Sequence, residues 1–286
     1  MSDAAHKETL LREVLAGYGR ALVAFSAGVD STYLLAVAQE VLGAACEAVT
    51  ADSPSLARTS LDEARRFCLD RGIAHHVVPT AEFEVEDYAR NDGKRCYHCK
   101  AALFAAMNGL ATATRAERGE AALLLGAIAE DFGDVRPGLQ AAAEAGARWP
   151  LAEVGLTKAE VRERSKALGL STWDRPAEPC LSSRVPYGET VTVEVVRMIE
   201  AAEAALRWLG LRECRARHHR VGGNRGHLCR IEVAEADLQK VLDARADLVP
   251  ALKRIGYAQV ALDLAGFSSG SLNDLLTTDE RKAATR

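Results

Sequence analysis

The chain has 286 residues, of which 48% are hydrophobic and 27% are charged, a composition typical of a globular protein with a sizeable core. Its formal net charge of −4 argues against a broad nucleic-acid-binding surface, which usually needs a basic excess. No apolar run is long enough to span a bilayer, and the polar start of the chain lacks the pattern of a signal peptide. We therefore expect a cytoplasmic protein without a membrane partner.

The first half of the chain alternates between helix and strand patterns. Apolar spacing at the helical period predicts helices over residues 7–20, 32–43 and 56–71. Short apolar runs predict strands over residues 21–25, 46–51, 74–78 and 123–126. This alternation predicts an α/β fold with a doubly wound parallel sheet that helices cover on both faces. The loops that follow residues 25, 51 and 125 should then meet at one crevice beyond the carboxyl ends of the strands.

Past residue 186 the pattern changes to that of a smaller α+β unit. Helices are expected over residues 191–209 and 236–244, and strands over residues 227–233 and 258–264. We predict a nucleotide-binding domain over residues 1–183 and a C-terminal substrate or oligomerisation domain over residues 184–275. Residues 276–286 are polar and are expected to form a flexible tail.

The most informative segment is the small-residue loop Ser26-Ala27-Gly28-Val29-Asp30-Ser31, which joins an apolar strand to an apolar helix. Backbone N–H groups in such a loop and at the helix N-terminus can converge on an anion. The segment is similar to the Ser-Gly-Gly-x-Asp-Ser signature of the PP-loop ATP pyrophosphatases, with Ala27 in place of the first glycine. That resemblance implies that the loop grips the pyrophosphate of ATP. The alternative is an ordinary strand-to-helix turn built from small residues.

Each side chain of this loop suggests a role. The hydroxyl groups of Ser26 and Ser31 can reach phosphate oxygens, whereas Asp30 would repel phosphate and suits Mg²⁺ or a bracing contact. Ala27 is expected to adopt a negative φ, because only glycine enters the region of positive φ cheaply.

A second candidate loop, Gly126 to Gly138, follows a buried strand. It places the carboxylates of Glu130, Asp131 and Asp134 near the expected crevice, together with Arg136. Carboxylates beside a phosphate site usually hold Mg²⁺, and an arginine there neutralises phosphate. The alternative is a solvated acidic loop.

The seven cysteines do not suggest a disulfide framework, because their number is odd and the chain is expected in the cytoplasm. Cys46 and Cys68 lie in apolar contexts and are expected in the core. The seven are Cys46, Cys68, Cys96, Cys99, Cys180, Cys214 and Cys229.

Three of these cysteines stand in loops or near charged residues. Cys96 and Cys99 form a C-x-x-C motif, and Cys180 follows a proline, with Arg184 nearby to favour a thiolate. A structural zinc site would need a second C-x-x-C pair, whereas three cysteines in two loops suit a 4Fe–4S cluster with one open iron. The alternative is three unrelated thiols.

Five segments, in order over nearly the whole chain, together resemble the LarE family. They are residues 26–31, 50–56, 126–138, 179–184 and 266–273. This family comprises the ATP-dependent sulfur transferases that make the nickel-pincer nucleotide cofactor for lactate racemase maturation. The resemblance implies a PP-loop fold of the adenine nucleotide alpha hydrolase type with a smaller C-terminal α+β domain. It also implies a homo-oligomer, usually a hexamer built from dimers.

The resemblance implies a reaction in which ATP adenylates a carboxylate of pyridinium-3,5-biscarboxylic acid mononucleotide and pyrophosphate leaves. Sulfur then converts the acyl adenylate into a thiocarboxylate, and two rounds give the bis-thiocarboxylate. The implied cofactors are ATP, Mg²⁺ and, because Cys96 and Cys99 accompany Cys180, a 4Fe–4S cluster held by these three cysteines. Sulfide or another sulfur donor is then expected to supply the sulfur, whereas members without the motif sacrifice the cysteine that matches Cys180.

The resemblance assigns further residues. Cys180, Arg184 and Lys100 would serve catalysis, with the two basic residues near phosphates. The nucleotide-binding set is Ser26, Gly28, Asp30, Ser31, Ser53, Gly126, Glu130, Asp131 and Arg136, and the substrate-phosphate set is Arg215 and Arg217. Glu203 and Glu232 are candidates to hold a divalent metal, or else a solvated helix glutamate and a strand-end glutamate. Cys214 and Cys229 have no assigned role.

Three other functions share parts of this pattern. A tRNA thiolase of the same superfamily would bring a basic surface, further C-x-x-C pairs or an RNA-binding domain. A PP-loop amidating synthetase adds nitrogen and needs no cysteine triad. An ATP-sensing module would bind ATP without releasing pyrophosphate.

Overall fold

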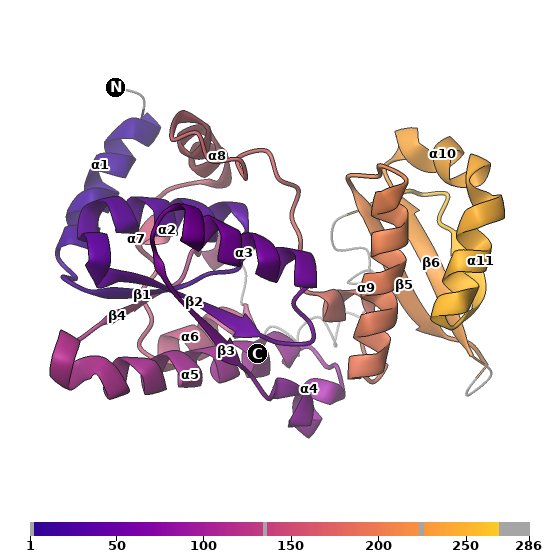
Figure 1. Ribbon diagram of the computed structural model, residues 1–286, viewed down its shortest axis with the longest axis horizontal. Helices are drawn as coiled ribbons and strands as arrows, with labels where there is room; N and C mark the ends of the chain where they lie inside the picture. Colours follow the sequence, from indigo (N-terminus) through magenta and orange to yellow (C-terminus); the bar gives the residue numbers. More distant parts are fainter. Residues whose placement is uncertain (1–2, 134–135, 223–225, 269–286) are drawn as a thin grey trace. The chain divides into compact units, whose positions relative to one another are not determined.

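The computed structural model describes residues 3–133, 136–222 and 226–268. These residues form two compact units, which we describe one at a time (Figure 1). The N-terminal unit comprises residues up to 82 and residues 96–178, and the C-terminal unit comprises residues 83–95 and residues from 179 onward. No described helix has the length and apolar character needed to cross a bilayer.

The N-terminal unit is built on a parallel sheet with the strand order β3-β2-β1-β4. Its strands are β1 (Ala21–Ala24), β2 (Cys46–Asp52), β3 (Ala74–Pro79) and β4 (Ala122–Leu124). Its helices are α1 (Asp3–Ala16), α2 (Val29–Leu42), α3 (Arg58–Asp70), α5 (Arg95–Arg118), α6 (Pro137–Glu144), α7 (Pro150–Glu153) and α8 (Lys158–Ala167). The predicted doubly wound α/β class is confirmed.

Burial of β1 on both faces sets the two layers of this unit. Val23 and Phe25 point to one face, where they join Leu34 and other apolar side chains of α2. Leu22 points to the other face, where it meets apolar side chains of α5 such as Phe104. Figure 1 shows α2 and α3 on one side of the sheet and α5 and α6 on the other. Successive residues on a strand point to opposite faces of the sheet, which explains why Leu22 and Val23 belong to different layers.

Four helices of this unit, α5, α6, α7 and α8, were not predicted from the sequence, and two of them bear on the site. The C-x-x-C motif begins α5, a helix of 24 residues, so Cys96 and Cys99 lie on a first helical turn rather than in a loop. Helix α8 begins at a capping box, in which Thr157 and Glu160 each bond the other's backbone amide. That Thr-x-x-Glu pattern is a local signal that marks the start of α8.

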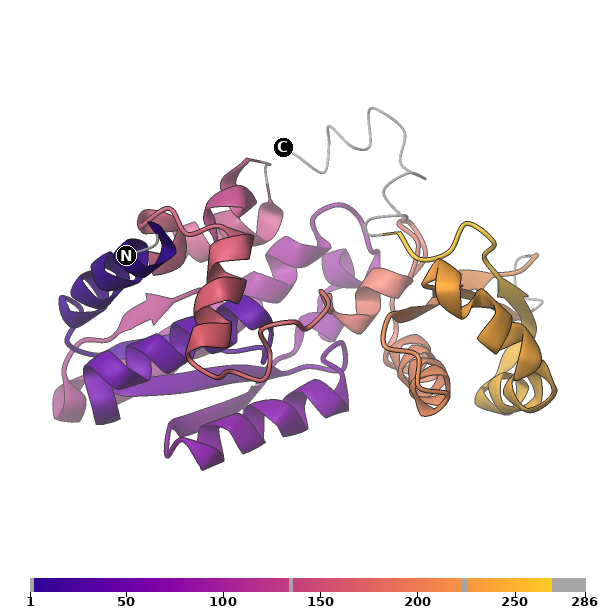
Figure 2. The same ribbon diagram turned by 90° about the horizontal axis from the view of Figure 1, so that it is seen from above.

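The C-terminal unit holds a three-stranded sheet of order β5-β6-β7. Its strands are β5 (Cys214–Arg220), β6 (His227–Val233) and β7 (Tyr257–Leu262), with β5 and β6 antiparallel and β6 and β7 parallel. Its helices are α4 (Glu86–Ala89), α9 (Val193–Trp208), α10 (Leu238–Asp243) and α11 (Arg245–Ile255). Helices α9 and α11 lie side by side on one face of the sheet (Figure 2).

The smaller C-terminal α+β unit is therefore confirmed, and β6 has the predicted bounds. Strand β5 was not predicted, because its run of arginines and histidines lacks the apolar pattern of a buried strand. Three predictions lie outside the described residues: the carboxylate Asp134, residues 269–273 of the last family segment, and the tail over 276–286.

His218 is a buried titratable group in the core of the C-terminal unit. Its side chain is 1% exposed, its Nδ1 lies 3.4 Å from Tyr257 Oη, and its ring centroid lies 4.6 Å from that of His227. Within the described residues its Nε2 has no hydrogen-bond partner. Burial, followed by the nearby His227, His219 and Arg220, lowers the pKa of His218 from 6.5 to about 4. The folded unit therefore holds this imidazole neutral.

We predict that the C-terminal unit loses stability as the pH falls from 6.5 toward 4. In this range the unfolded chain binds a proton on His218 and the folded chain does not. The stabilisation is therefore complete above pH 6.5 and declines as the pH falls toward 4. The loss should reach about 2 kcal/mol near pH ~5, since one pKa unit corresponds to about 1.4 kcal/mol. Urea unfolding at neutral and acid pH measures it.

The matched variants are His218→Phe, which keeps a ring in the core, and His6→Gln at an exposed position of α1. His218→Phe should flatten the pH dependence, and His6→Gln should keep that of the parent. Equal pH dependence in the parent and in His218→Phe would contradict this interpretation.

Candidate functional site

The loop between β1 and α2 contains an alanine in a conformation that favours glycine. Ala27 has a φ of 57°, so the expectation of a negative φ is wrong. Two contacts explain how a residue with a Cβ stays there. The Ala27 methyl group is packed in the core of the unit, at 3% exposure. The Ala27 carbonyl oxygen accepts a hydrogen bond from Arg175 Nη1 at 2.9 Å.

Hydroxyl groups hold the rest of the loop. Ser31 Oγ accepts a hydrogen bond from the Ser26 amide at 3.3 Å, lies 3.1 Å from Ser26 Oγ, and donates to the Gly28 carbonyl at 3.2 Å. Gly28 is the N-cap of α2, and within the described residues no side chain caps it. The first-turn N–H groups of α2 and the helix dipole are thus left to favour an anion.

The backbone conformation of Gly28 does not require glycine. Its φ of −75° and ψ of 167° are extended values that any residue adopts. A Cβ added there would lie 3.4 Å from Ser26 Oγ and 4.0 Å from Ser31 Oγ. The missing side chain therefore leaves the two hydroxyl groups uncovered.

The end of β4 meets this loop. A Cβ added at Gly126 would lie only 3.0 Å from the Ser31 amide nitrogen and 3.1 Å from the carbonyl carbon of Asp30. Glycine is therefore required at residue 126 by the close approach of two backbone segments. The loops that follow residues 25 and 125 come together at the sheet edge, as the parallel topology predicts.

The predicted carboxylates of this edge that the structure describes, Asp30, Glu130 and Asp131, have partners. Both oxygens of Asp30 bind Lys158 Nζ, at 2.8 and 2.6 Å, and Glu130 accepts a hydrogen bond from the Lys158 amide at 2.9 Å. Asp131 accepts from the Ile128 amide at 3.0 Å and pairs with Arg136 Nη1 at 2.5 Å. The start of α8 is thereby tied to the loops that follow β1 and β4.

Ser53 lies at the end of β2, where its side chain is buried. Its Oγ donates to the buried carboxylate of Glu82, lies 2.9 Å from Ser55 Oγ, and accepts from the Ser55 amide at 3.0 Å. These contacts shape the turn that leads into α3.

The first turn of α5 packs against α6. A Cβ added at Gly138 would lie 3.1 Å from Lys100 Cγ and 3.8 Å from Cys96 Cβ. Cys96 is exposed and Cys99 is half-buried, and their spacing of three residues places them on the same side of the helix. The C-x-x-C motif, Lys100 and the end of the loop after β4 are therefore neighbours within the N-terminal unit.

The seven cysteines divide by burial into two groups. Burial raises the pKa of Cys46, Cys68 and Cys229 to about 12 and that of Cys214 to about 11, so these thiols are neutral core groups. The core placement predicted for Cys46 and Cys68 is confirmed. The accessible thiols are Cys96, Cys99 and Cys180.

These three thiols suit an iron–sulfur cluster by the chemistry of their donor atoms, because thiolates are the usual ligands of such clusters. Cys96 and Cys99 belong to the N-terminal unit, and Cys180 belongs to the C-terminal unit. Over its described residues, neither unit by itself gathers three His, Cys, Asp or Glu side chains that could hold a metal ion.

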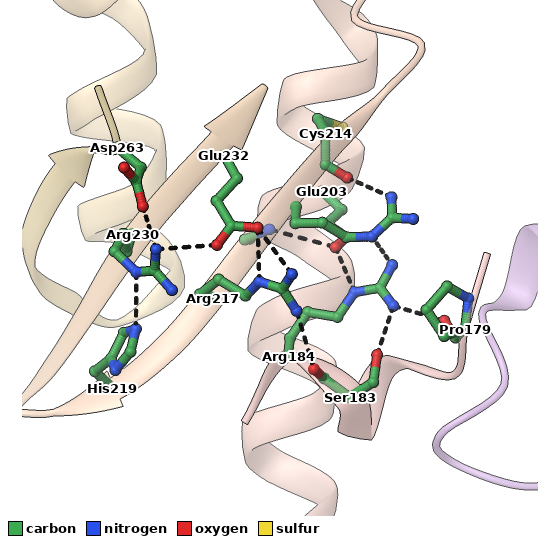
Figure 3. Close-up of polar contacts among 12 residues, drawn as sticks. Pro179, Ser183, Arg184, Glu203, Cys214, Arg217, His219, Arg230, Glu232 and Asp263 are labelled. Carbon is green, nitrogen blue, oxygen red and sulfur yellow. Dashed lines mark hydrogen bonds and ion pairs between the residues drawn. The ribbon is translucent and has the colours of Figure 1, made fainter. Parts of the chain in front are cut away.

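Cys180 lies directly before a short 3₁₀ turn over Leu181–Arg184, and Arg184 braces that turn from inside (Figure 3). The Arg184 side chain is 2% exposed. Its Nε donates to Glu203 at 2.7 Å, and its Nη1 donates to the carbonyl oxygens of Pro179 at 2.6 Å and Cys180 at 3.2 Å. Arg184 therefore fixes the backbone that carries Cys180.

Glu203 is the shared acceptor of this network. Besides Arg184 it accepts from Arg207 Nη2 at 3.0 Å and from the Ala216 amide at 3.3 Å, and it is fully buried. Glu232 is also fully buried, and pairs with Arg217 at 2.8 Å and Arg230 at 3.0 Å. The alternative of a solvated Glu203 is wrong, because arginine side chains enclose it.

Arg215 and Arg217 lie on the same face of β5, since they are two residues apart. Arg215 donates to the Cys214 carbonyl at 2.8 Å and stacks over Phe267 at 5.0 Å. Burial, followed by the like charge of Arg184, lowers the pKa of Arg215. In this network the arginines outnumber the carboxylates, which suits an anionic ligand. Its members are Arg184, Glu203, Arg207, Arg215, Arg217, Arg230, Glu232 and Asp263.

Two residues of the N-terminal site, Lys158 and Arg175, were not predicted from the sequence. Lys158 follows the capping-box threonine of α8, and Arg175 follows the end of α8. The capping box is a signal that could have placed Lys158. Nothing local connects Arg175 with Ala27, because 148 residues separate them.

Comparison with known proteins places the chain among three relatives, and no protein-family model matches it. It is 36% identical to the pyridinium-3,5-bisthiocarboxylic acid mononucleotide synthase of Lactiplantibacillus plantarum, over 97% of each chain. It is 42% identical to an uncharacterized protein of Synechocystis, over 93% of this chain and 97% of that protein. An uncharacterized protein of Methanocaldococcus jannaschii is 24% identical, over 87% of this chain and 90% of that protein.

We predict that Gly28→Ala leaves the fold intact but weakens the binding of inorganic pyrophosphate about tenfold, or about 1.4 kcal/mol. The added methyl group would cover the hydroxyl groups of Ser26 and Ser31. Titration calorimetry measures the affinity. Gly109→Ala in α5 is the matched control, since a Cβ there meets nothing within 4 Å. Unchanged affinity in Gly28→Ala would show that no anion approaches these hydroxyls.

We predict that Glu203→Gln destabilises the C-terminal unit by about 3–5 kcal/mol, because it leaves buried arginines without their carboxylate. Glu194→Gln changes an exposed residue of the same helix and should shift stability by no more than about 0.5 kcal/mol. Urea unfolding followed by circular dichroism compares the two variants. A small effect of Glu203→Gln would mean that water reaches these arginines.

Proposed function

The chain belongs to the LarE family of pyridinium-3,5-bisthiocarboxylic acid mononucleotide synthases, and from this membership we propose an ATP-dependent sulfur transferase. It would convert the carboxylates of pyridinium-3,5-biscarboxylic acid mononucleotide into thiocarboxylates. The observation that carries the proposal is the identity of 36% to the Lactiplantibacillus enzyme over 97% of each chain. The loop between β1 and α2 and the accessible cysteines supply the chemistry.

ATP would activate the substrate carboxylate. A carboxylate is a poor electrophile, and a mixed anhydride with AMP gives it a good leaving group. The carboxylate oxygen attacks the α-phosphorus, and the bond to the β-phosphate oxygen breaks and releases pyrophosphate. The loop from Ser26 to Ser31 supports this step, because its hydroxyl groups and the N-terminus of α2 stabilise the leaving anion.

Mg²⁺ would be held at the same edge of the sheet. Because the described carboxylates there do not form a ligand cage of their own, Mg²⁺ would be bound mainly by the phosphate oxygens of ATP, with one of Asp30, Glu130 and Asp131 as a further ligand. The ion would neutralise charge on the phosphates of ATP. Lys100 and Arg136 would add basic groups near the loop after β4, besides Lys158 at Asp30.

The C-terminal unit would bind the phosphate of the mononucleotide substrate. Arg215 and Arg217 share one face of β5, inside a network in which arginines outnumber carboxylates. A doubly charged phosphate would balance that excess. Arg184 would act on the neighbouring Cys180 by fixing its backbone.

Cys180 would handle the sulfur, together with Cys96 and Cys99. As three thiolates they would hold a 4Fe–4S cluster, which when bound offers an open iron to carry sulfide. In each round, hydrosulfide sulfur attacks the acyl carbon of the adenylate, its proton goes to solvent, and AMP leaves. Two rounds therefore consume two ATP and two sulfides and release two AMP and two pyrophosphates.

Anaerobic incubation with ATP, sulfide and the pyridinium dicarboxylate mononucleotide tests the proposal, with mass spectrometry of product and protein. We expect one AMP and one pyrophosphate for every sulfur transferred, and product that exceeds the protein in amount while Cys180 remains cysteine. No pyrophosphate release with this substrate would overturn the function. Thiolation of added tRNA instead would identify a tRNA thiolase.

Cysteine variants separate activation from sulfur delivery. Cys96→Ser, Cys99→Ser and Cys180→Ser should each lower the bound iron from about four per chain and abolish turnover, yet still release pyrophosphate. Cys68→Ala, a buried control in the N-terminal unit, should keep both iron and turnover. Mass loss of H₂S from Cys180, with no more than one sulfur transferred per chain, would contradict the cluster and identify a sacrificed cysteine.

A further inference from the structure

The left-handed conformation of Ala27 is held by a residue from outside the loop. A φ of 57° is unfavourable for a residue with a Cβ. The Ala27 carbonyl accepts a hydrogen bond from Arg175 Nη1 at 2.9 Å, across 148 positions of sequence. The bond links the loop after β1 to the segment after α8.

Arg175 is itself anchored through both its backbone and its guanidinium group. Its amide donates to the Thr172 carbonyl at 3.0 Å, and its carbonyl accepts from Arg162 Nη2 at 2.6 Å. Its Nη2 pairs with Glu63 Oε2 on α3 at 2.7 Å, and its side chain is 22% exposed. The donor that reaches Ala27 therefore comes from a fixed position in the N-terminal unit.

This hydrogen bond sets the direction of the next amide. The carbonyl of Ala27 and the N–H of Gly28 belong to one planar trans peptide, so they point in opposite directions. Arg175 holds the carbonyl toward itself and thereby turns the Gly28 N–H to the other side of the peptide. Ser31 Oγ fixes the following peptide by donating to the Gly28 carbonyl at 3.2 Å.

We propose that Arg175 is a positioning residue of the anion-binding loop. Through the carbonyl of Ala27 it stabilises the left-handed conformation and aims the Gly28 amide at the anion. The inference rests on the proposed function for the identity of that anion, the pyrophosphate of ATP. A glycine at residue 27 would hold this conformation without help, so the need for Arg175 follows from Ala27.

A double-mutant cycle tests this dependence, with inorganic pyrophosphate as the probe in titration calorimetry. Arg175→Gln should weaken pyrophosphate binding about tenfold when residue 27 is alanine, because the strained peptide can then turn over. In the Ala27→Gly background the same change should cost no more than about threefold. Arg175→Lys, which keeps one donor, should recover part of the loss.

Glu63→Gln is the matched control, because it removes the ion pair of Arg175 but leaves the bond to Ala27. It should change affinity by less than about threefold. An equal loss on Arg175→Gln in both backgrounds would overturn the proposal, since Arg175 would then bind the anion directly or act only as a general structural support.

Thermal unfolding without ligand tests the same coupling independently of the anion. Arg175→Gln should lower the melting temperature more in the parent than in the Ala27→Gly background. Equal shifts would overturn the positioning role even if pyrophosphate binds. A further outcome is coupling between Arg175 and Ala27 in melting temperature when the parent binds neither pyrophosphate nor ATP. That result would contradict the proposed function, while Arg175 would still be the residue that restrains Ala27.

Discussion

Burial of β1 on both faces is the constraint on which the functional edge of the N-terminal unit depends. β1 lies between β2 and β4, so its backbone groups are hydrogen-bonded on both sides. Both faces of β1 are also buried, so its side chains must be apolar. The chain first becomes polar after β1 ends, at Ser26. Asp30 and Ser31, at the start of α2, then approach the end of β4 so closely that residue 126 favours glycine. The position and shape of the loop from Ser26 to Ser31 therefore follow from the burial of β1 and its closeness to β4 in the sheet.

The C-terminal unit is organised around buried arginine side chains. A buried cation is tolerated only with partners, and Glu203 and Glu232 supply them from α9 and β6. Each carboxylate is shared by two arginines, so the network keeps a positive excess that a substrate phosphate would neutralise. The same contacts hold the backbone of Cys180, so the proposed phosphate site and the proposed sulfur-handling cysteine depend on one framework.

The sequence was sufficient for the parallel sheet, the strand-loop-helix after β1 and the presence of a smaller C-terminal α+β unit, because apolar runs and small-residue turns are local signals. It was insufficient for β5, since a strand carrying Arg215 and Arg217 is buried only when distant glutamates pair with it. The prediction of a negative φ for Ala27 was wrong for the same reason. The conformational preference of alanine is a local rule, whereas the hydrogen bond from Arg175 comes from a distant part of the sequence.

Ala27 is then more than a tolerated replacement for glycine. An alanine restricts the unfolded loop more than a glycine does, so less conformational entropy is lost when the loop adopts its binding conformation. That advantage exists only if the folded protein removes the strain, and the anchored Arg175 supplies the required bond. Packing of the Ala27 methyl group in the core adds to it. The loop is thus ordered in advance, which would lower the cost of binding the proposed pyrophosphate leaving group.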